Sequence, residues 1–190
     1  MLETIELLID EDEDKIGVFA ISLVESPAIE SNFVALSKQD IKLTIVDAEK
    51  RLVVGLALMP DKEIYRKNGE YEYNIKFSKD TVRKASQIYL REMFNKNTTL
   101  EHAEMAEGVY LVESWIVEDP KMDKISLFNI EAPAGAWAVS MKVDNDEVWQ
   151  RVKQGEYMGF SIEGVFDEKK VDTYREKWER IKQIIGEDRV

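Results

Sequence analysis

The chain of 190 residues contains no cysteine and a single histidine. The absence of cysteine excludes disulfides, thiolate zinc sites, cysteine nucleophiles and iron–sulfur clusters. One histidine excludes any metal site built from several imidazoles. Basic residues are also few, because 26 Lys and Arg stand against 38 Asp and Glu and leave a formal net charge of -12. Binding to a phosphate backbone depends on Lys and Arg, so we expect no nucleic-acid partner.

Signals for membranes and for bound metal are missing as well. No run approaches the roughly 20 apolar residues that a membrane-spanning helix needs. The first residues lack the basic start and the long apolar stretch of a signal peptide. The acidic cluster at residues 10–14 is no EF-hand loop, because Lys15 and Ile21 stand where glycine and the closing glutamate belong. We expect a soluble intracellular protein with no membrane partner and no metal.

Short runs of β-branched and aromatic residues with partial alternation predict a strand-rich chain. The runs lie at residues 18–24, 42–46, 51–59, 71–77, 109–117, 137–143 and 158–166, with shorter extended pieces at 33–36 and 100–102. Asn68-Gly69 predicts a tight hairpin turn between two of the strands.

Two helices have clear start signals. Ser78 predicts the N-cap of a helix whose apolar stripe consists of Val82, Ala85, Ile88, Tyr89 and Met93. Asp144, with Glu147 three residues later, predicts the capping box of a shorter helix that ends at Gly155. Residues 172–185 have the charged, amphipathic pattern of a third helix.

Together these elements predict an α+β fold, a mainly antiparallel, barrel-like sheet with two or three flanking helices. We divide the chain into an N-terminal extended arm with the first strands at residues 1–40, a barrel core at 41–170 and a C-terminal helix at 171–190.

His102 is the candidate general base. It ends a strand-like segment and enters an acidic turn that contains glycine, and functional side chains concentrate at such junctions. Imidazole titrates near neutrality, so it is suited to take the proton of a hydroxyl nucleophile. A structural role for a lone histidine remains the alternative.

Ser161 is the candidate nucleophile. It lies between Gly159 and Gly164, and glycines weaken a strand unless backbone or ligand approaches closely there. Strand alternation directs Ser161 and Glu163 away from the core face. The competing serines, each inside a strand-like run, are Ser114 and Ser140.

Glu113 is an acid at an unexpected place. Alternation puts it on an apolar face of the strand at residues 109–117, and burying a carboxylate is costly unless it is paired. A contact with His102, which it would orient, explains the position. A strand end that reaches water or a lysine explains it equally well.

Several of these segments, in this order, resemble the XkdF-like serine proteases of tailed phages and prophages, a branch of the phage prohead (capsid maturation) proteases. The resemblance runs from about residue 17 to residue 166. Its motifs lie at residues 20–24, 27–30, 33–37, 59–61, 64–66, 99–102, 112–117, 137–143, 148–155 and 159–164.

The resemblance implies an endopeptidase inside the assembling prohead, in the host bacterial cytoplasm, with scaffold and major capsid protein as substrates and often itself. It leaves a homo-oligomer open, and it implies no cofactor. Its fold would be similar to the herpesvirus assembly proteases. The family's histidine falls on His102 and its nucleophile on Ser161. Catalysis would be acyl transfer, with backbone N–H groups stabilising the oxyanion.

The third catalytic residue cannot be a second histidine, because the chain has only one. Glu113 is the first choice and Glu163 the second, since a residue two positions along a strand lies roughly 6.5–7 Å from Ser161. Asp167 is a third choice. Two other classes of protein remain as alternatives, a catalytically silent head-associated structural protein with this fold and a carboxylate-rich metal-binding module.

Overall fold

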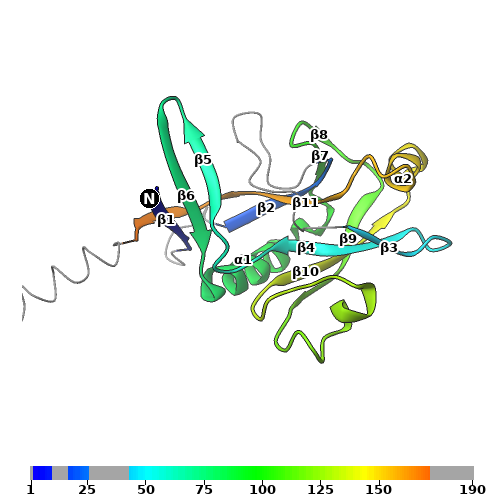
Figure 1. The fold of residues 1–190 in the computed structure, drawn as a ribbon. Coiled ribbons are helices and arrows are strands. Elements are labelled where there is room, and N and C mark those ends of the chain that lie inside the picture. The colour runs from blue at the N-terminus through cyan, green and yellow to red at the C-terminus, as the bar shows by residue number, and fades with distance from the viewer. Residues whose placement is uncertain (1, 10–16, 26–42, 172–190) are drawn as a thin grey trace, which may run out of the picture.

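The computed structural model describes residues 2–9, 17–25 and 43–171. This part of the chain has an α+β fold, with twelve strands in three four-stranded sheets and two α-helices (Figure 1). The α+β class of the prediction is therefore confirmed. None of the three sheets closes on itself into a barrel within these residues. None of the helices found there is both long enough and apolar enough to cross a membrane.

The first sheet contains the strands β12 (Asp167–Lys170), β1 (Glu3–Leu8), β6 (Tyr71–Phe77) and β5 (Ile64–Asn68), in that spatial order. The second sheet has the order β3 (Thr44–Asp47), β4 (Leu52–Leu58), β10 (Trp137–Val143) and β9 (Val109–Ile116). The third sheet has the order β11 (Gly159–Val165), β2 (Gly17–Val24), β7 (Thr98–Leu100) and β8 (Glu104–Met105).

Neighbouring strands in the described sheets run antiparallel except for two pairs, β1 with β6 and β2 with β7, which are parallel. The prediction of a mainly antiparallel protein is confirmed. Both parallel pairs involve strands from the N-terminal segment, and both of these strands lie inside a sheet rather than at an edge. The strands β1 and β2 therefore pair directly with the rest of the fold.

Most of the predicted strands are present, but four were missed, β1, β5, β12 and the two-residue β8, which lies in the predicted acidic turn. β1 alternates only partly, and β12 consists wholly of charged residues. The two strands are held by backbone pairing with each other. β5 pairs with β6 through the hairpin turn that Asn68-Gly69 predicts, and Gly69 has a φ of 63°. The predicted acidic turn at 10–14, the extended piece at 33–36 and the helix at 172–185 lie outside the described residues.

Helix α1 (Lys79–Arg91) begins as predicted. The side chain of Ser78 accepts a hydrogen bond from the backbone N–H of Thr81, and Val82, Ala85 and Tyr89 are buried against the core. Met93 does not continue the apolar stripe. The helix ends at Arg91, Met93 takes a left-handed φ of 58°, and its side chain is 80% exposed.

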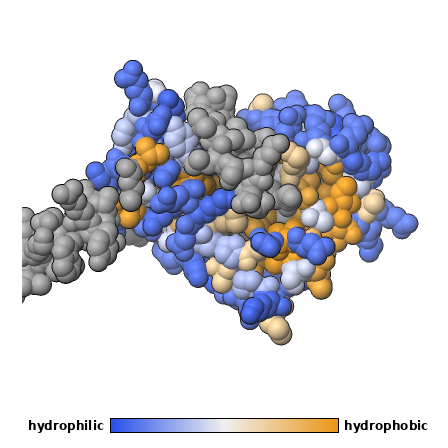
Figure 2. Space-filling view, in the orientation of Figure 1, coloured by the Kyte–Doolittle hydropathy of each residue, from blue (hydrophilic) through white to orange (hydrophobic). Residues whose placement is uncertain are grey.

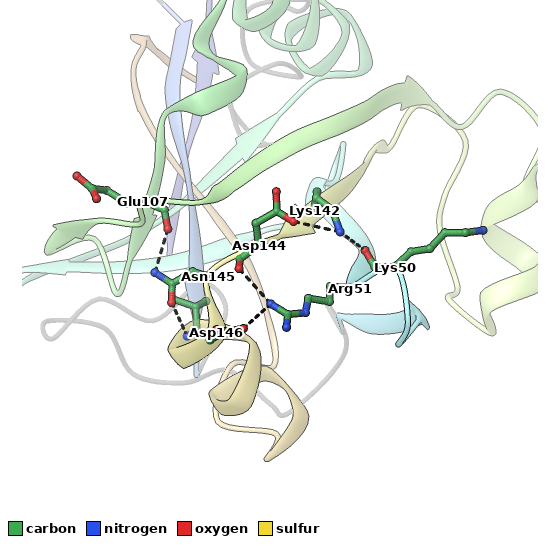
Figure 3. A network of polar contacts seen from close by, with 8 residues as sticks. Lys50, Arg51, Glu107, Lys142, Asp144, Asn145 and Asp146 are labelled. Atoms are coloured by element: carbon green, nitrogen blue, oxygen red, sulfur yellow. Dashed lines mark hydrogen bonds and ion pairs between the residues drawn. The ribbon is translucent and has the colours of Figure 1, made fainter.

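Helix α2 (Asp146–Lys153) begins one residue later than predicted. Asn145, and not Asp144, is the N-cap, since its side chain accepts a hydrogen bond from the N–H of Val148 at 3.0 Å. Asp144 instead pairs with Lys142, and its carbonyl oxygen accepts a hydrogen bond from Arg51 (Figure 3). These contacts fix the end of β10 against the turn before β4. Because Asn145 is the N-cap, the capping prediction was wrong by one position.

The core consists of one large apolar cluster and a smaller one. The larger cluster draws on all three sheets and both helices, and the smaller one lies between β4, β10 and the segment that includes the short 3-10 helix Lys124–Phe128. The second and third sheets are joined by a backbone hydrogen bond from Leu43 N–H to the carbonyl oxygen of Met158, 2.7 Å long. In the view of Figure 2, hydrophobic side chains gather around β3 and β4, and hydrophilic ones cover α2 and the β5–β6 hairpin.

Candidate active site

A row of three hydroxyl side chains crosses the third sheet. In the register of the strands, Ser161 on β11 lies opposite Ser22 on β2, and Ser22 lies beside Thr99 on β7. Residues that face each other across neighbouring strands project from the same side of the sheet. The other side belongs to the core, where Ile21, Leu23 and Phe160 are fully buried. The sheet therefore sets the hydroxyl row on the side that faces away from the large apolar cluster.

His102 reaches this row from the turn between β7 and β8. Glu101 and His102 both have positive φ, 50° and 56°, and the N–H of Ala103 bonds the carbonyl oxygen of Leu100 at 2.9 Å. Two consecutive positive φ angles are characteristic of the type I′ hairpin turn, in which Asn and Gly are the preferred residues. A bulky side chain in this conformation stores strain, and such residues cluster at functional sites.

The turn is fastened to β2 on its other side. The N–H of Glu101 donates to the carbonyl oxygen of Leu23 at 3.0 Å, and the Glu101 carboxylate accepts a hydrogen bond from the N–H of Glu25 at 2.6 Å. These contacts hold the turn in place although its residues are poor formers of positive φ. The imidazole of His102 is consequently presented from a fixed backbone.

Four side chains form one connected polar cluster, Ser22, Thr99, His102 and Glu163. Nδ1 of His102 lies 2.9 Å from Oγ of Ser22 and 3.3 Å from Oε1 of Glu163. The same Oε1 accepts hydrogen bonds from Ser22, at 2.8 Å, and from Thr99. The oxygens of Ser22 and Thr99 are also in close contact. The carboxylate that sequence reasoning ranked second is thus the one beside the imidazole.

The cluster favours the ionised form of Glu163. Burial opposes the charge, but the hydrogen bonds from Thr99, Ser22 and His102 outweigh it and hold the pKa of Glu163 below its ordinary value of 4.5. The side chains of His102 and Glu163 are 18% and 23% exposed. An ionised carboxylate that is partly shielded from water can stabilise positive charge on the neighbouring imidazole.

Ser161 is the hydroxyl of the row that remains accessible. It is partly exposed, whereas Ser22 is fully buried and Thr99 is 8% exposed. In residues 2–9, 17–25 and 43–171, no hydrogen bond joins the hydroxyl of Ser161 to His102. Catalytic hydrogen bonds are often long in an enzyme without substrate and tighten only when substrate binds.

Gly164 is needed where the sequence suggests a close approach. A Cβ atom on this residue would lie 2.7 Å from the carbonyl oxygen of Gly17, which no side chain tolerates. A register shift between Glu163 and Gly164 occurs at the same point of the β2–β11 ladder. The close backbone approach predicted for this glycine is confirmed.

Glu113 does not reach the imidazole. Its side chain is 51% exposed and forms an ion pair with Lys124 at 2.7 Å. A bulge in β9 explains the difference from the prediction, because Glu113 pairs with Ser140 while Leu111 pairs with Met141, so Val112 is an extra residue. The bulge reverses the alternation, and Glu113 points away from the large core. The expectation of an inward-facing carboxylate that orients His102 is corrected accordingly.

The other candidates lie apart from the cluster. Oγ of Ser114 accepts a hydrogen bond from the indole of Trp137 at 2.8 Å, and Ser140 is buried in the second sheet. Asp167 belongs to β12 in the first sheet. Among the described residues, no group of three His, Asp or Glu side chains is arranged to hold a metal ion.

Sequence reasoning missed Ser22 and Thr99. A signal for Ser22 was present, because it is the one polar residue in the run Gly17–Val24, whose strand lies in the middle of a sheet. A polar residue in a buried strand requires a hydrogen-bond partner. The identity of that partner depends on the order of the strands, which the sequence does not give.

Comparison with known proteins identifies the family. Searches of the curated proteins and of the solved structures find no match. A family model described as "Putative phage serine protease XkdF" matches residues 40–170. The matched range includes His102, Ser161 and all three candidate acids, and it begins after Ser22. Since it covers more than half of the chain, this protein belongs to the family of XkdF phage serine proteases.

Proposed function

We propose that the protein is a serine endopeptidase in which Ser161 is the nucleophile, His102 the general base and Glu163 the acid that orients the base. The contact of the Glu163 carboxylate with Nδ1 of His102, at 3.3 Å, is the observation that carries this proposal. Because Nδ1 of His102 contacts the carboxylate, Nε2 is the ring nitrogen that can take the proton of the nucleophile. This division of the two nitrogens is the one that serine proteases use on unrelated folds.

The reaction would be acyl transfer in two halves. His102 takes the hydroxyl proton of Ser161 while the oxygen attacks the carbonyl carbon of the peptide bond. The C–N bond then breaks, and the imidazolium returns its proton to the leaving amine. Water hydrolyses the acyl-serine in the second half, with His102 again as base. Glu163 stabilises the imidazolium in both halves without taking the proton.

The biological substrates belong to the same proposal. We propose that the protein acts inside the assembling prohead, in the host bacterial cytoplasm, on scaffold and major capsid protein and on its own chain; the match to a phage serine protease family supports this proposal. The proposal includes a barrel-like fold similar to that of the herpesvirus assembly proteases, and the packing of β11 of the third sheet against β4 of the second sheet is compatible with sheets that wrap around one core. A homo-oligomer is compatible with this arrangement.

A fluorophosphonate probe tests the assignment of the nucleophile. An activated serine attacks the phosphorus, fluoride leaves, and a stable phosphonate ester remains on the residue. We expect mass spectrometry of the labelled chain to find the adduct on Ser161, and to find it lost in Ser161→Ala and strongly reduced in His102→Ala. An adduct on Ser114 or Ser140, or labelling that does not depend on His102, would overturn the assignment.

A further inference from the structure

We infer that Ser22 is a positioning residue of the active site, a buried hydroxyl that links the imidazole of His102 to the carboxylate of Glu163 and fixes the imidazole tautomer. The inference rests on the proposed function for its role in catalysis. The family model begins at residue 40 and does not include Ser22.

The proton count on Ser22 determines the direction of its hydrogen bonds to Glu163 and His102. An ionised carboxylate only accepts hydrogen bonds, so the single hydroxyl proton of Ser22 is donated to Oε1 of Glu163, at 2.8 Å. The oxygen of Ser22 therefore meets Nδ1 of His102, at 2.9 Å, as an acceptor. Nδ1 must then carry a proton, which leaves the lone pair on Nε2. This is the tautomer that a base acting on Ser161 requires.

Ser22 is closer to the imidazole than the carboxylate is. The distance from Nδ1 is 2.9 Å to Ser22 and 3.3 Å to Glu163. When the imidazole becomes charged, the hydroxyl passes the stabilising effect of the carboxylate on through a hydrogen bond that is already polarised. Ser22 is 0% exposed, so it does not touch a substrate and acts only through His102 and Glu163.

Thr99 is a second hydroxyl that holds the same carboxylate oxygen. Its hydroxyl donates to Oε1 of Glu163, and its side chain is 8% exposed. Two donors on one oxygen restrict the rotation of the carboxylate and keep that oxygen directed at Nδ1. Both donors project from the same side of the sheet because Ser22 and Thr99 are neighbours across the β2–β7 pair.

The single histidine makes the tautomer directly measurable. Only one imidazole contributes to a nitrogen-15 spectrum of the labelled full chain, so its two ring nitrogens need no assignment by mutation. We expect the neutral wild-type imidazole to carry its proton on Nδ1. In Ser22→Ala this preference should weaken or reverse. In the same variant kcat should fall by about 10- to 100-fold, with KM nearly unchanged, because the imidazole of His102 and the carboxylate of Glu163 have lost a buried hydrogen-bond partner.

Variants at β7 supply the controls. Thr99→Val should weaken the tautomer preference in the same direction, and Thr99→Ser should restore it, because only the hydroxyl matters. Thr98→Val is the matched control on the opposite face of the same strand. Thr98 is buried, and its hydroxyl has no hydrogen-bond partner in the described part of the chain. This variant should change neither the tautomer nor kcat.

The outcomes separate this inference from the proposed function. An unchanged tautomer in Ser22→Ala overturns the inference, whether or not the protein cleaves peptides. A changed tautomer in a protein whose wild type cleaves nothing supports the role of Ser22 and overturns the peptidase assignment. A rise in KM with kcat intact would place Ser22 in substrate binding and would also overturn the inference.

Discussion

Ser161 and Ser22 are directly paired across the neighbouring strands β11 and β2, yet only Ser161 is partly exposed. The buried hydroxyl is bonded to His102 and Glu163, and the accessible one has no such bond within the described residues. Under the proposed function the two serines have different tasks. Ser22 is fixed in the hydrogen-bonded cluster, and Ser161 is the hydroxyl that approaches a substrate.

Replacement of Ser161 tests the second task. Ser161→Ala should abolish cleavage of scaffold and capsid protein and should leave the melting temperature within a few degrees of the wild type, because a partly exposed hydroxyl contributes little packing. Co-expression with the head proteins, followed by gel electrophoresis, measures the cleavage. Ser140→Ala, in a different sheet, is the matched control and should process normally. Full processing by Ser161→Ala would end the assignment.

The pH dependence of cleavage tests the base. Because the hydrogen bonds to Glu163 hold its pKa below 4.5, this carboxylate stays ionised throughout the range from pH 5 to 8. Imidazole is the group that ordinarily loses its proton in this range, and only the neutral form accepts the serine proton. The rate of peptide cleavage should therefore rise with pH between 5 and 8. A flat profile measured under kcat/KM conditions would contradict the role of His102.

The sequence predicts much of the fold because most strands carry a clear apolar pattern. The strand β10 and the helix α1 are recognisable by composition and by the cap at Ser78. The strand β12, which is wholly charged, is not recognisable at all. Its structure comes from antiparallel pairing with β1, and pairing between distant segments leaves no local signal.

The site is predicted in part for a related reason. His102 and Ser161 stand out because each is a chemically unusual residue next to turn signals. The error at Glu113 arises from one extra residue, Val112, in a strand that is apolar on both faces. Alternation cannot locate a bulge when neither face is polar, since both phases of the pattern then look alike. Which of the two acids lies beside the imidazole therefore depends on strand register, which is a tertiary property.

Two glutamine substitutions compare the acids directly. Glu163→Gln should reduce kcat by about 100- to 10,000-fold, because the amide no longer stabilises the imidazolium or fixes its tautomer. Glu113→Gln removes only an exposed ion pair with Lys124, worth about 0–1 kcal/mol of stability, and should cleave at nearly the wild-type rate. Both variants are assayed on one peptide substrate, with circular dichroism to verify folding. Normal cleavage by Glu163→Gln would exclude the proposed triad.

Acid stability should also distinguish Glu163→Gln from the wild type. The pKa of Glu163 is lower in the folded chain than its ordinary value of 4.5, so the unfolded chain binds more protons in this range. The resulting contribution to stability is complete above the ordinary value and is lost as the pH falls through the folded pKa. Urea unfolding at pH 6, 4 and 3 should therefore show a larger acid-induced loss for the wild type than for Glu163→Gln. Parallel losses in the two proteins would contradict the hydrogen-bonded, ionised carboxylate.

The left-handed conformation of His102 makes a prediction about stability that is independent of catalysis. Both His102→Gly and His102→Ala remove the imidazole, but only glycine adopts a φ of 56° without steric cost. After the greater flexibility of glycine in the unfolded chain is subtracted, His102→Gly should be more stable than His102→Ala by up to about 1 kcal/mol.

A glycine in the same turn supplies the control for this comparison. Ala103 is the next residue and has no positive φ, so Ala103→Gly should lose about 0.5–1 kcal/mol of stability through chain entropy alone. Chemical denaturation of the three variants measures these differences. If glycine is less stable than alanine by the same amount at positions 102 and 103, His102 is not strained. The expected result is that His102→Gly is more stable than His102→Ala, that Ala103→Gly is less stable than the wild type, and that both His102 variants lack peptide cleavage. This result would mean that the chain keeps histidine in this conformation for its chemistry and at the expense of stability.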